Sequence, residues 1–363
     1  MKRLQRLKNI LRRQDIDAML VTQPENRRYL SGYTPGDLNI GESSGALLIF
    51  RSGRPVLMTD SRFQLQAEEE VFVYDVLIYK RGLLELLKTL LVGRGVRKLA
   101  FESEYFLYSS YEKLQKISDE LKIELLPQAG VVEKKRKVKD DGELAKIRAS
   151  VALNEAVFQE AFKKIRPGMS ERQLAILIET LMREKGAERP SFETIVAGGP
   201  NGAKPHAVPG DRPLQAGEPI VIDMGLVLDG YCSDMTRTVV LGEPDEKTKQ
   251  IFRLVRKAQL AGVMAIRSGV TGSVVDKAAR DIIEKGGFGE YFGHGLGHGV
   301  GLAVHEAPSL SGRYRKKLQP GMVVTVEPGI YLPGWGGVRL ENMAVVTADG
   351  CEVLNTDTTF LDL

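Results

Sequence analysis

Two stretches of the chain, about a hundred residues apart, carry the same signals in the same order and decide the fold. Residues 165–170 read Ile-Arg-Pro-Gly-Met-Ser, and residues 266–271 read Ile-Arg-Ser-Gly-Val-Thr. Each stretch ends a helical pattern, and each then offers a hydroxyl, Ser170 or Thr271, where the next helix begins. Gln173 completes a capping box with Ser170. We interpret the two stretches as a weak internal repeat, in which two halves, each of two helices followed by strands, face each other.

The strands after the first helix pair carry acidic residues in apolar surroundings. Residues 219–226 and 231–240 are predicted to pair around the turn Asp229-Gly230, a strong hairpin signal. In that register Asp223 and Asp234 share one face as diagonal neighbours, about 7–8 Å apart at the backbone. Two acids inside apolar strands are costly unless a cation or a proton lies between them. The hairpin therefore suggests a cation site.

All four histidines fall within two glycine- and proline-rich segments, residues 204–209 and 293–306. They are His206 in the first segment and His294, His298 and His305 in the second. Histidine is the commonest metal ligand and a frequent proton carrier, so this confinement indicates chemistry. Glycine at every second position of residues 293–301 predicts an extended backbone. The side chains expected on one face are His294, Leu296, His298 and Val300.

Two glutamates complete an acidic set. Glu327 ends the apolar run at residues 322–326, and Glu341 is embedded in the run at residues 338–346. With the two aspartates and one imidazole they form an oxygen-rich set, which suits Mn²⁺, Co²⁺, Fe²⁺ or Zn²⁺ better than a structural thiolate zinc site. Four carboxylates around one ion would be an excess of charge, and two ions about 3.5–4 Å apart would balance it.

Residues 1–130 alternate helical and strand patterns, which predicts an α/β layer domain without a cofactor fingerprint. An opening helix has Leu4, Leu7 and Leu11 on one face, strands are expected at residues 18–21, 46–50, 55–59, 71–74 and 98–101, and a helix is expected at residues 83–91. Residues 131–141 are expected to link this domain to a second one, residues 142–363. The charged run at residues 133–141 is interpreted as a solvated segment and strand end, because it is too short for a nucleic-acid patch.

Composition sets limits on partners and compartment. The net charge of +4 is spread along the chain, and the longest apolar runs, such as residues 46–50, are far too short to cross a bilayer. Cys232 and Cys351 cannot make a disulfide framework and suit a reducing compartment. We therefore expect a cytoplasmic protein with no nucleic-acid or membrane partner.

Five ordered motifs within residues 142–363 resemble the pita-bread family of metallopeptidases. They are Asp223-Met224-Gly225, residues 233–238, residues 293–306, Glu327-Pro328-Gly329 and residues 338–341. Residues 190–196 and 201–206 resemble the proline-specific branch, as do residues 29–32 and 59–63 of the first domain. The resemblance implies an α/β N-terminal creatinase-like domain and an α+β C-terminal pita-bread domain with a pseudo-twofold repeat.

Carried over position by position, the resemblance implies five metal ligands for two divalent ions, Mn²⁺ or Co²⁺ first and Zn²⁺ or Fe²⁺ second. The ligands are Asp223 at one metal, Asp234 and Glu341 as bridges, and His298 and Glu327 at the other metal. The resemblance also implies that His305 steadies the tetrahedral intermediate and that His206 contacts the substrate near the scissile bond. Glu327 would in addition carry a proton to the leaving nitrogen. The role of His294 stays open, either beside the ligands or simply packed near them.

The implied reaction is hydrolysis of the bond between an N-terminal residue and proline. We favour an Xaa-Pro aminopeptidase over an Xaa-Pro dipeptidase (prolidase), because Ser309 stands where some dipeptidases carry an arginine for the substrate carboxylate. Arg339 or Lys204 could bind that carboxylate instead. Asn342 and Ala303 also replace acids that are frequent in the family, and neither position is a ligand.

Three other functions compete. A creatinase-like amidinohydrolase would lack the metal set, and methionine aminopeptidases generally lack the first domain. A pseudo-peptidase that acts as a binding protein, the non-enzyme alternative, would be expected to have lost ligands. The resemblance also implies a homodimer, since relatives often dimerise through the N-terminal domain.

Overall fold

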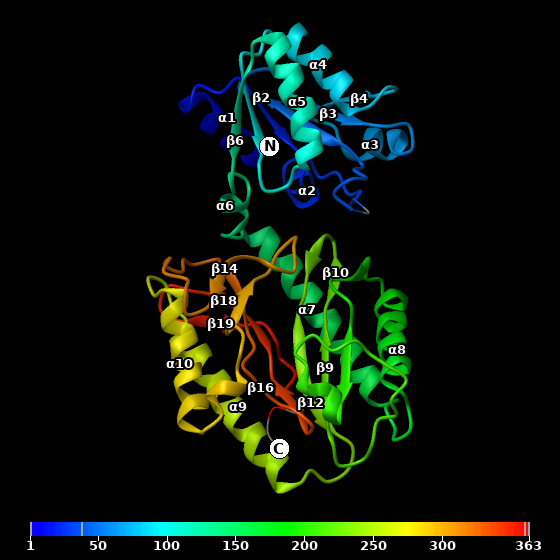
Figure 1. Ribbon diagram of the computed structural model, residues 1–363, viewed down its shortest axis with the longest axis vertical. Helices are drawn as coiled ribbons and strands as arrows, with labels where there is room; N and C mark the ends of the chain where they lie inside the picture. Colours follow the sequence, from blue (N-terminus) through cyan, green and yellow to red (C-terminus); the bar gives the residue numbers. More distant parts are fainter. Residues whose placement is uncertain (1, 38, 359–360, 362–363) are drawn as a thin grey trace. The chain divides into compact units, whose positions relative to one another are not determined.

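The computed structural model describes residues 2–37, 39–358 and 361, which form two compact units that divide between Lys135 and Arg136. Among the described helices, none combines the length with the apolar character that crossing a membrane requires. Each unit has its own sheet system and its own buried core (Figure 1).

The first unit is built on one six-stranded sheet in the order β4-β3-β2-β1-β5-β6. The strands are β1 (Ala18–Val21), β2 (Ala46–Phe50), β3 (Val56–Thr59), β4 (Asp75–Ile78), β5 (Lys98–Glu102) and β6 (Glu124–Gln128). Only β2 runs antiparallel to its neighbours; the other pairs are parallel. The helices of this unit are α1 (Lys2–Arg13), α2 (Pro24–Ser31), α3 (Gln64–Glu70), α4 (Leu83–Gly93) and α5 (Tyr108–Leu121).

Most elements predicted for this unit are present, and one is wrong. The α1 face with Leu4, Leu7 and Leu11 is buried, as expected from its helical spacing. The strand expected at residues 71–74 is absent, and β4 begins just after it at Asp75. Phe72 is 77% exposed, so the apolar run that suggested a strand marks a surface bend instead.

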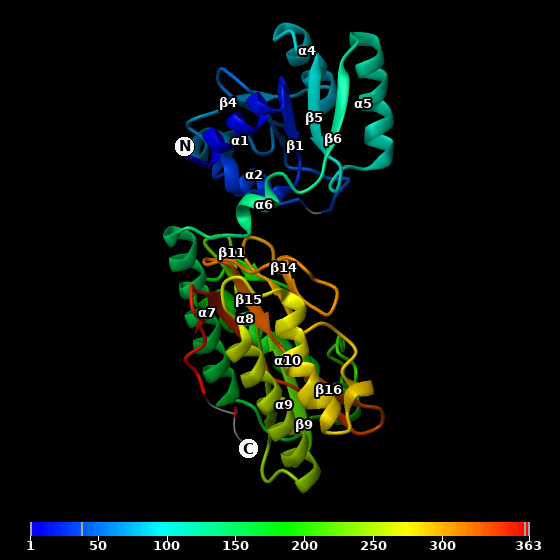
Figure 2. The ribbon, with the colours of Figure 1, turned by 90° about the vertical axis from the view of Figure 1, so that its left-hand side faces the viewer.

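Two helix pairs in the second unit confirm the internal repeat. They are α7 (Asp141–Phe162) with α8 (Glu171–Glu184), and α9 (Glu246–Ala265) with α10 (Gly272–Lys285). The members of each pair contact each other, and Figure 2 shows α9 and α10 side by side. Ser170 and Gln173 make the predicted capping box, because each side chain accepts a hydrogen bond from the backbone N–H of the other.

Strands β7–β12 follow the first helix pair and strands β13–β19 follow the second, and together they form four small sheets. They are β11-β10-β7, β12-β9-β8, β14-β13-β15-β18-β19 and β16-β17. The strands are β7 (Arg189–Pro190), β8 (Ile195–Gly198), β9 (Pro219–Met224), β10 (Leu226–Leu228), β11 (Tyr231–Cys232), β12 (Met235–Val240), β13 (Gly297–Gly299), β14 (Glu306–Leu310), β15 (Val323–Val326), β16 (Gly329–Leu332), β17 (Gly336–Arg339), β18 (Asn342–Val346) and β19 (Cys351–Val353). Two 3₁₀ turns, η1 (Gly199–Ala203) and η2 (Gly289–Tyr291), complete the unit.

The predicted hairpin register is correct. Leu228 pairs with Tyr231 across the Asp229-Gly230 turn, and the same register continues to Asp223, which pairs with Thr236. Asp229 has a φ of 49° and Gly230 a φ of 82°, the left-handed values that a tight hairpin turn of this kind requires. Asp234 therefore lies diagonally from Asp223, two positions from Thr236 on the same face.

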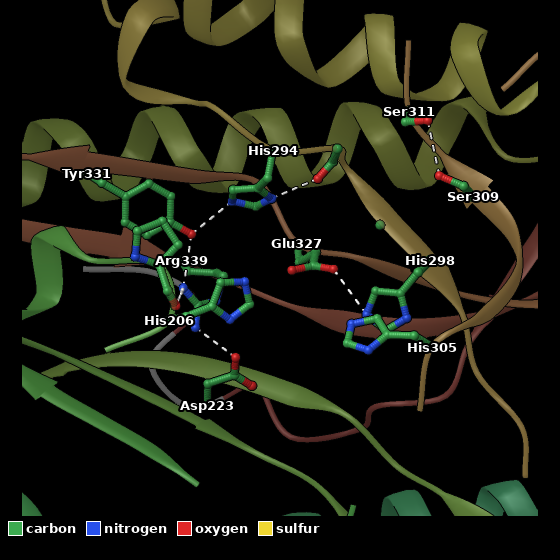
Figure 3. A pocket seen from close by; sticks show the side chains of 13 residues that line it. His206, Asp223, His294, His298, His305, Ser309, Ser311, Glu327, Tyr331 and Arg339 are labelled. Atoms are coloured by element: carbon green, nitrogen blue, oxygen red, sulfur yellow. Dashed lines mark hydrogen bonds and ion pairs between the residues drawn. The ribbon is translucent and has the colours of Figure 1, made fainter. Parts of the chain in front are cut away.

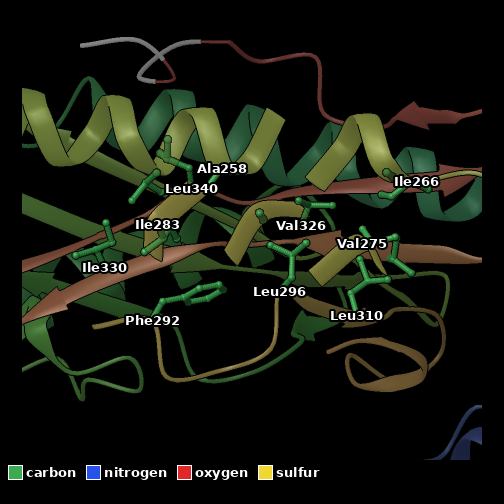
Figure 4. Close-up of a cluster of buried hydrophobic side chains, with 14 of the residues drawn as sticks. Ala258, Ile266, Val275, Ile283, Phe292, Leu296, Leu310, Val326, Ile330 and Leu340 are labelled. Atoms are coloured by element: carbon green, nitrogen blue, oxygen red, sulfur yellow. The ribbon is translucent and has the colours of Figure 1, made fainter. Parts of the chain in front are cut away.

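Each half of the second unit has a separate apolar core, which makes the strands between them rigid supports. One core lies under α7 and α8 and includes Phe158, Ile178 and Ile222. The other lies under α9 and α10 and includes Phe252, Leu296 and Leu340 (Figure 4).

The charged run at residues 133–141 differs from the prediction. It begins with a short helix, α6 (Glu133–Arg136), and it forms no strand end. Arg136 and Lys139 are only 3% and 5% exposed, so these two cations are buried and not solvated.

We predict that Phe252→Ala lowers the free energy of unfolding of the second unit by about 3–5 kcal/mol, because Phe252 is fully buried and its removal leaves a cavity. Urea unfolding followed by circular dichroism measures the change. Met264→Ala on the same helix is the matched control, since Met264 is 82% exposed and its loss should cost less than about 0.5 kcal/mol. Equal losses for the two variants would contradict the assigned core.

Candidate metal centre

Strand ends and strand breaks bring the acidic residues together. Asp223 is the last but one residue of β9, and Asp234 lies in the break between β11 and β12. Glu327 follows β15, and Glu341 lies in the break between β17 and β18. His298 is the middle residue of β13. At such a position the side chain can point into the cleft, while the adjacent strand keeps its hydrogen bonds to the sheet.

Three of these side chains come close enough to hold one ion. Asp234, His298 and Glu341 each offer a ligand atom, and these atoms lie within 4.8 Å of one another. The Nε2 atom of His298 lies 3.5 Å from Asp234 Oδ2 and 3.3 Å from Glu327 Oε1. Glu327 therefore lies beside the other three side chains and contacts the His298 imidazole.

Asp223 is held at the edge of the group by a guanidinium. Arg339 donates a hydrogen bond from Nη2 to Asp223 Oδ2 at 2.7 Å. Two carboxylate oxygens of the group, Asp223 Oδ1 and Glu341 Oε1, are buried and have no hydrogen-bond partner among the described residues. Buried acceptors of this kind are normally satisfied. Two unsatisfied acceptors beside an imidazole nitrogen and two further carboxylates fit a divalent cation.

The pKa values of these side chains are shifted by burial and by the charges of their neighbours. Burial raises the pKa of Asp234 and of Glu341 well above its ordinary range, and the neighbouring carboxylates add to both shifts. Burial raises the pKa of Glu327 to about 8. Burial, with His305 beside it, lowers the pKa of His298 to about 4, so its imidazole is neutral near pH 7 and free to bind a metal. Without a cation, the site favours protonated acids.

Threonine hydroxyl groups donate hydrogen bonds that orient two of the carboxylates. Thr236 donates to Glu341 Oε2 at 2.8 Å, and Thr325 donates to Glu327 Oε1 at 3.1 Å. Arg339 donates from Nε to Thr236 Oγ1 at 3.0 Å, so one guanidinium supports two of the acids. Partners of this kind fix ligand orientation and tune affinity.

The four histidines surround the same cleft (Figure 3). The rings of His298 and His305 lie 4.1 Å apart between centroids. His294 Nε2 and the Tyr331 hydroxyl share a hydrogen bond of 2.9 Å, and the same hydroxyl accepts one from Arg339 at 2.9 Å. Burial lowers the pKa of His294 to about 4, so it is neutral near pH 7.

The cleft has two lobes with a common wall. The common wall consists of His206, Asp223, His298, His305 and Glu327. The Tyr331 lobe, of about 260 Å³, is completed by Pro205, His294, Gly295, Gly297, Ser309, Ser311, Tyr331 and Arg339. The Phe192 lobe, of about 240 Å³, is completed by Phe192, Glu193, Ile195, Ala207, Val208, Pro209, Asp234 and Glu341. A substrate chain can thus extend to both sides of the carboxylate group.

One prediction about the histidine segment is wrong, and the sequence did not indicate three of the residues that contact the site. The expected single face of the histidine segment is wrong, because bends precede β13 and Leu296 packs into the apolar core while His298 lies in the cleft. Thr236, Thr325 and Tyr331 were not anticipated, since a hydroxyl in a strand gives no local signal. Arg339 did have a signal, as a charge in an apolar strand two positions before Glu341.

Comparisons with known proteins identify the family of each domain. The model of Metallopeptidase family M24 matches residues 145–348, and that of the Creatinase/Prolidase N-terminal domain matches residues 3–138. The Xaa-Pro dipeptidase of Pyrococcus horikoshii is 34% identical over 355 residues, which cover 97% of this chain and 96% of that protein.

Solved structures with both domains are equally similar. The Xaa-Pro dipeptidase from Bacillus anthracis superposes with a TM-score of 0.90 at 38% identity and covers 98% of each chain. The X-Pro aminopeptidase from Thermotoga maritima superposes with a TM-score of 0.85 at 37% identity, covering 94% of this chain and 96% of that one. These similarities confirm the family resemblance and the predicted two-domain fold class. Because both activities occur among the relatives, they do not distinguish aminopeptidase from dipeptidase.

We predict that metal-free protein loses stability as pH rises from about 7 to 8.5, above the ordinary histidine pKa of 6.5, below which the lowered pKa values of His294 and His298 act in the opposite direction. The folded acids hold protons up to a pKa of about 8 for Glu327, whereas the unfolded chain releases them near the ordinary value of 4.5. The folded state thus binds more protons in this window, and its stability falls as pH rises. A divalent cation replaces those protons, so added Mn²⁺ should raise the melting temperature more at pH 8.5 than at pH 7, by at least about 4 °C.

Differential scanning calorimetry with and without Mn²⁺ at both pH values measures this difference. The double variant Asp234→Asn, Glu341→Gln is the control, because neutral amides remove two of the titrating groups and should flatten the pH dependence. An equal effect of Mn²⁺ at both pH values would contradict the assignment.

Proposed function

This chain belongs to metallopeptidase family M24 and is a metallo-exopeptidase, and we propose that it releases an N-terminal residue from peptides whose second residue is proline. The observation that carries the proposal is the approach of Asp234, His298 and Glu341 to within 4.8 Å at the wall of a two-lobed cleft. The family implies divalent metal ions, and the unsatisfied oxygens of this group fit them.

We assign two divalent ions to five ligands, with Mn²⁺ or Co²⁺ as the first candidates and Zn²⁺ or Fe²⁺ as the second. The ligands are Asp223, Asp234, His298, Glu327 and Glu341. Their four carboxylates carry four negative charges, and the charged side chain that contacts them is Arg339. Two dications match the four negative charges of the carboxylates, whereas one matches only half of them.

When bound, the two cations supply Lewis acidity and a water that is nucleophilic near neutral pH. The chain's own residues do the rest of the proposed chemistry. His305 lies in the common wall and donates a hydrogen bond to the oxyanion that develops on the scissile carbonyl. Glu327 takes the proton of the attacking water and passes it to the leaving imide nitrogen. His206, in the same wall, contacts the substrate beside the scissile bond.

Peptides longer than two residues are the preferred substrates in this proposal. A dipeptide ends in a carboxylate beside the proline, which would require a free cation in the cleft. Among the described lining residues, Arg339 is the one permanent cation, and it is 3% exposed with hydrogen bonds to Asp223, Tyr331, Thr236 and Pro205. Because these hydrogen bonds already hold the Arg339 guanidinium, we do not expect it to bind the substrate carboxylate. Lys204 contacts Asn201 and is not a lining residue of either lobe.

Xaa-Pro dipeptidase (prolidase) is the second candidate function. Several relatives bear that name, among them the Bacillus anthracis and Pyrococcus horikoshii proteins. The dipeptidase assignment would be favoured if a histidine of the Tyr331 lobe bound the substrate carboxylate.

We predict two divalent ions per chain at full activity, measured by elemental analysis. Asp234→Ala should abolish activity together with tight metal binding, because it would remove one of the five proposed ligands. His305→Ala should keep the metal and lower kcat by on the order of 10²–10³, the effect of losing an oxyanion donor. Full activity with one ion, or loss of metal from His305→Ala, would contradict these roles.

We predict release of the free N-terminal amino acid from Xaa-Pro-Yaa peptides and little cleavage of matched Xaa-Ala-Yaa peptides. Product analysis by mass spectrometry, with Mn²⁺, Co²⁺ and Zn²⁺ in parallel, tests this. Tripeptides should be cut at least as well as Xaa-Pro dipeptides, because the cleft offers no free cation for a dipeptide carboxylate. Strict preference for dipeptides would change the assignment to prolidase, and efficient cleavage of Met-Ala peptides would refute proline specificity.

We also propose that the protein acts as a cytoplasmic homodimer. Light scattering at micromolar concentration should give a mass near twice the chain mass of 40.1 kDa. A monomer under these conditions would remove the dimer from the proposal.

A further inference from the structure

We propose that Glu306 is a positioning residue, which directs the neighbouring His305 ring into the cleft because two buried cations fix the Glu306 carboxylate. The cations are Arg136 and Lys139. The inference rests on the proposed function only for the role of His305, and the contacts that support it are independent of that role.

The three charged side chains form a buried ion triad. Lys139 Nζ donates to Glu306 Oε1 at 2.7 Å, and Arg136 Nη2 donates to Glu306 Oε2 at 2.5 Å. The side chains are 1% exposed for Lys139, 3% for Arg136 and 8% for Glu306. Exposed ion pairs hold a side chain weakly, but a buried carboxylate with a cation on each oxygen has one strongly preferred position.

The Glu306 carboxylate lies against the backbone at Gly301. A Cβ atom at Gly301 would lie 2.5 Å from Glu306 Oε1, so only glycine lets the carboxylate rest against the loop there. Gly299 at the end of β13 pairs with Glu306 at the start of β14. The loop that contains His305 is thus anchored at its end by the β13–β14 pairing and by the triad.

His305 depends on this anchor because its ring has few contacts of its own. Among the described residues, no hydrogen bond is made to the His305 ring, whose aromatic contact is with His298 at 4.1 Å. His305 lies in a bend directly before β14 and is joined to Glu306 by one peptide bond, so fixing Glu306 restricts the directions open to the His305 side chain, which lines both lobes of the cleft.

Glu306→Gln tests the role, because it keeps the size of the side chain and removes its charge. On an Xaa-Pro-Yaa peptide, kcat should fall by roughly 10–100-fold, as a misplacement of about 1 Å can cause, with KM within about 3-fold of the wild type. The metal content should stay unchanged, since Glu306 is not among the proposed ligands.

Nuclear magnetic resonance provides a readout that does not require turnover. The chain has four histidines, so the full-length protein with ¹⁵N-labelled histidine and bound Zn²⁺ gives four ring systems. The His305 signals, assigned from His305→Ala, should shift or broaden in Glu306→Gln. The His294 signals should not change, because His294 is held by Tyr331.

Two further variants make the test decisive. Glu352→Gln breaks an ion pair with Arg148 whose side chains are 47% and 43% exposed, and it should change neither kcat nor the His305 signals. Lys139→Gln removes one cation and should give a smaller change than Glu306→Gln; it replaces that variant if Glu306→Gln does not fold.

Unchanged His305 signals in Glu306→Gln or Lys139→Gln would overturn the inference, even if kcat fell. A shift of the His305 signals with a fall in kcat and stable KM would support it. If the wild-type protein does not cleave Xaa-Pro peptides, the proposed function fails, and the His305 shift still decides whether Glu306 positions the ring.

Discussion

The mutual repulsion of four clustered carboxylates, two of them buried, is the constraint on which the rest of the second unit depends. Two unit charges 4 Å apart interact with about 4 kcal/mol at the effective dielectric of a protein surface, and more strongly where water is excluded. Asp234 and Glu341 are 5% and 1% exposed, so water screens them little. The fold must therefore hold these groups together against their repulsion and leave space for positive charge between them. Burial raises the pKa of both acids, and repulsion from the neighbouring carboxylates raises it further.

Two separate cores provide the rigidity that this arrangement requires. The core under α7 and α8 supports β9 and β12, which flank the hairpin acids, and the core under α9 and α10 supports β15, β17 and β18. The acids stand where these strands end or break, so each side chain is placed by a packed strand while its own backbone can turn into the cleft. Glycines allow the close approach: a side chain at Gly225 would collide with Ser233 and Ser191, and one at Gly297 would collide with Thr325.

Buried cations stabilise the surroundings of the site. Arg339 lies between Asp223, Thr236 and Tyr331, and it connects two of the carboxylates to His294 through hydrogen bonds. Arg136 and Lys139 form a second buried cluster with Glu306, the residue that follows His305. A guanidinium suits such positions because it stays charged and offers several donors in fixed directions. Arg339 thus supports the acids of the cleft, whereas Arg136 and Lys139 support the residue next to His305.

Local patterns in the sequence determined a large part of this protein. The helix ends around residues 165–170 and 266–271 predicted the repeat, and the Asp229-Gly230 turn predicted the register that puts Asp223 and Asp234 on one face. Acids and histidines in glycine-rich or apolar segments also predicted which residues would line the cleft. These signals are local, because turn chemistry, capping and side-chain periodicity act over a few residues.

Only the tertiary structure decided where individual charges and rings are held. A run of cations at residues 133–141 reads as solvated, yet Arg136 is buried against Glu306, a residue 170 positions away. An apolar run at residues 71–74 reads as a strand, yet the sheet takes the next four residues and leaves Phe72 exposed. Alternating glycines predict one histidine face, yet bends before β13 send Leu296 into the core and His298 into the cleft. In each case the outcome depends on which distant segment fills the adjacent space, because burial and ion pairing are set by packing between elements and not by the order of neighbouring residues.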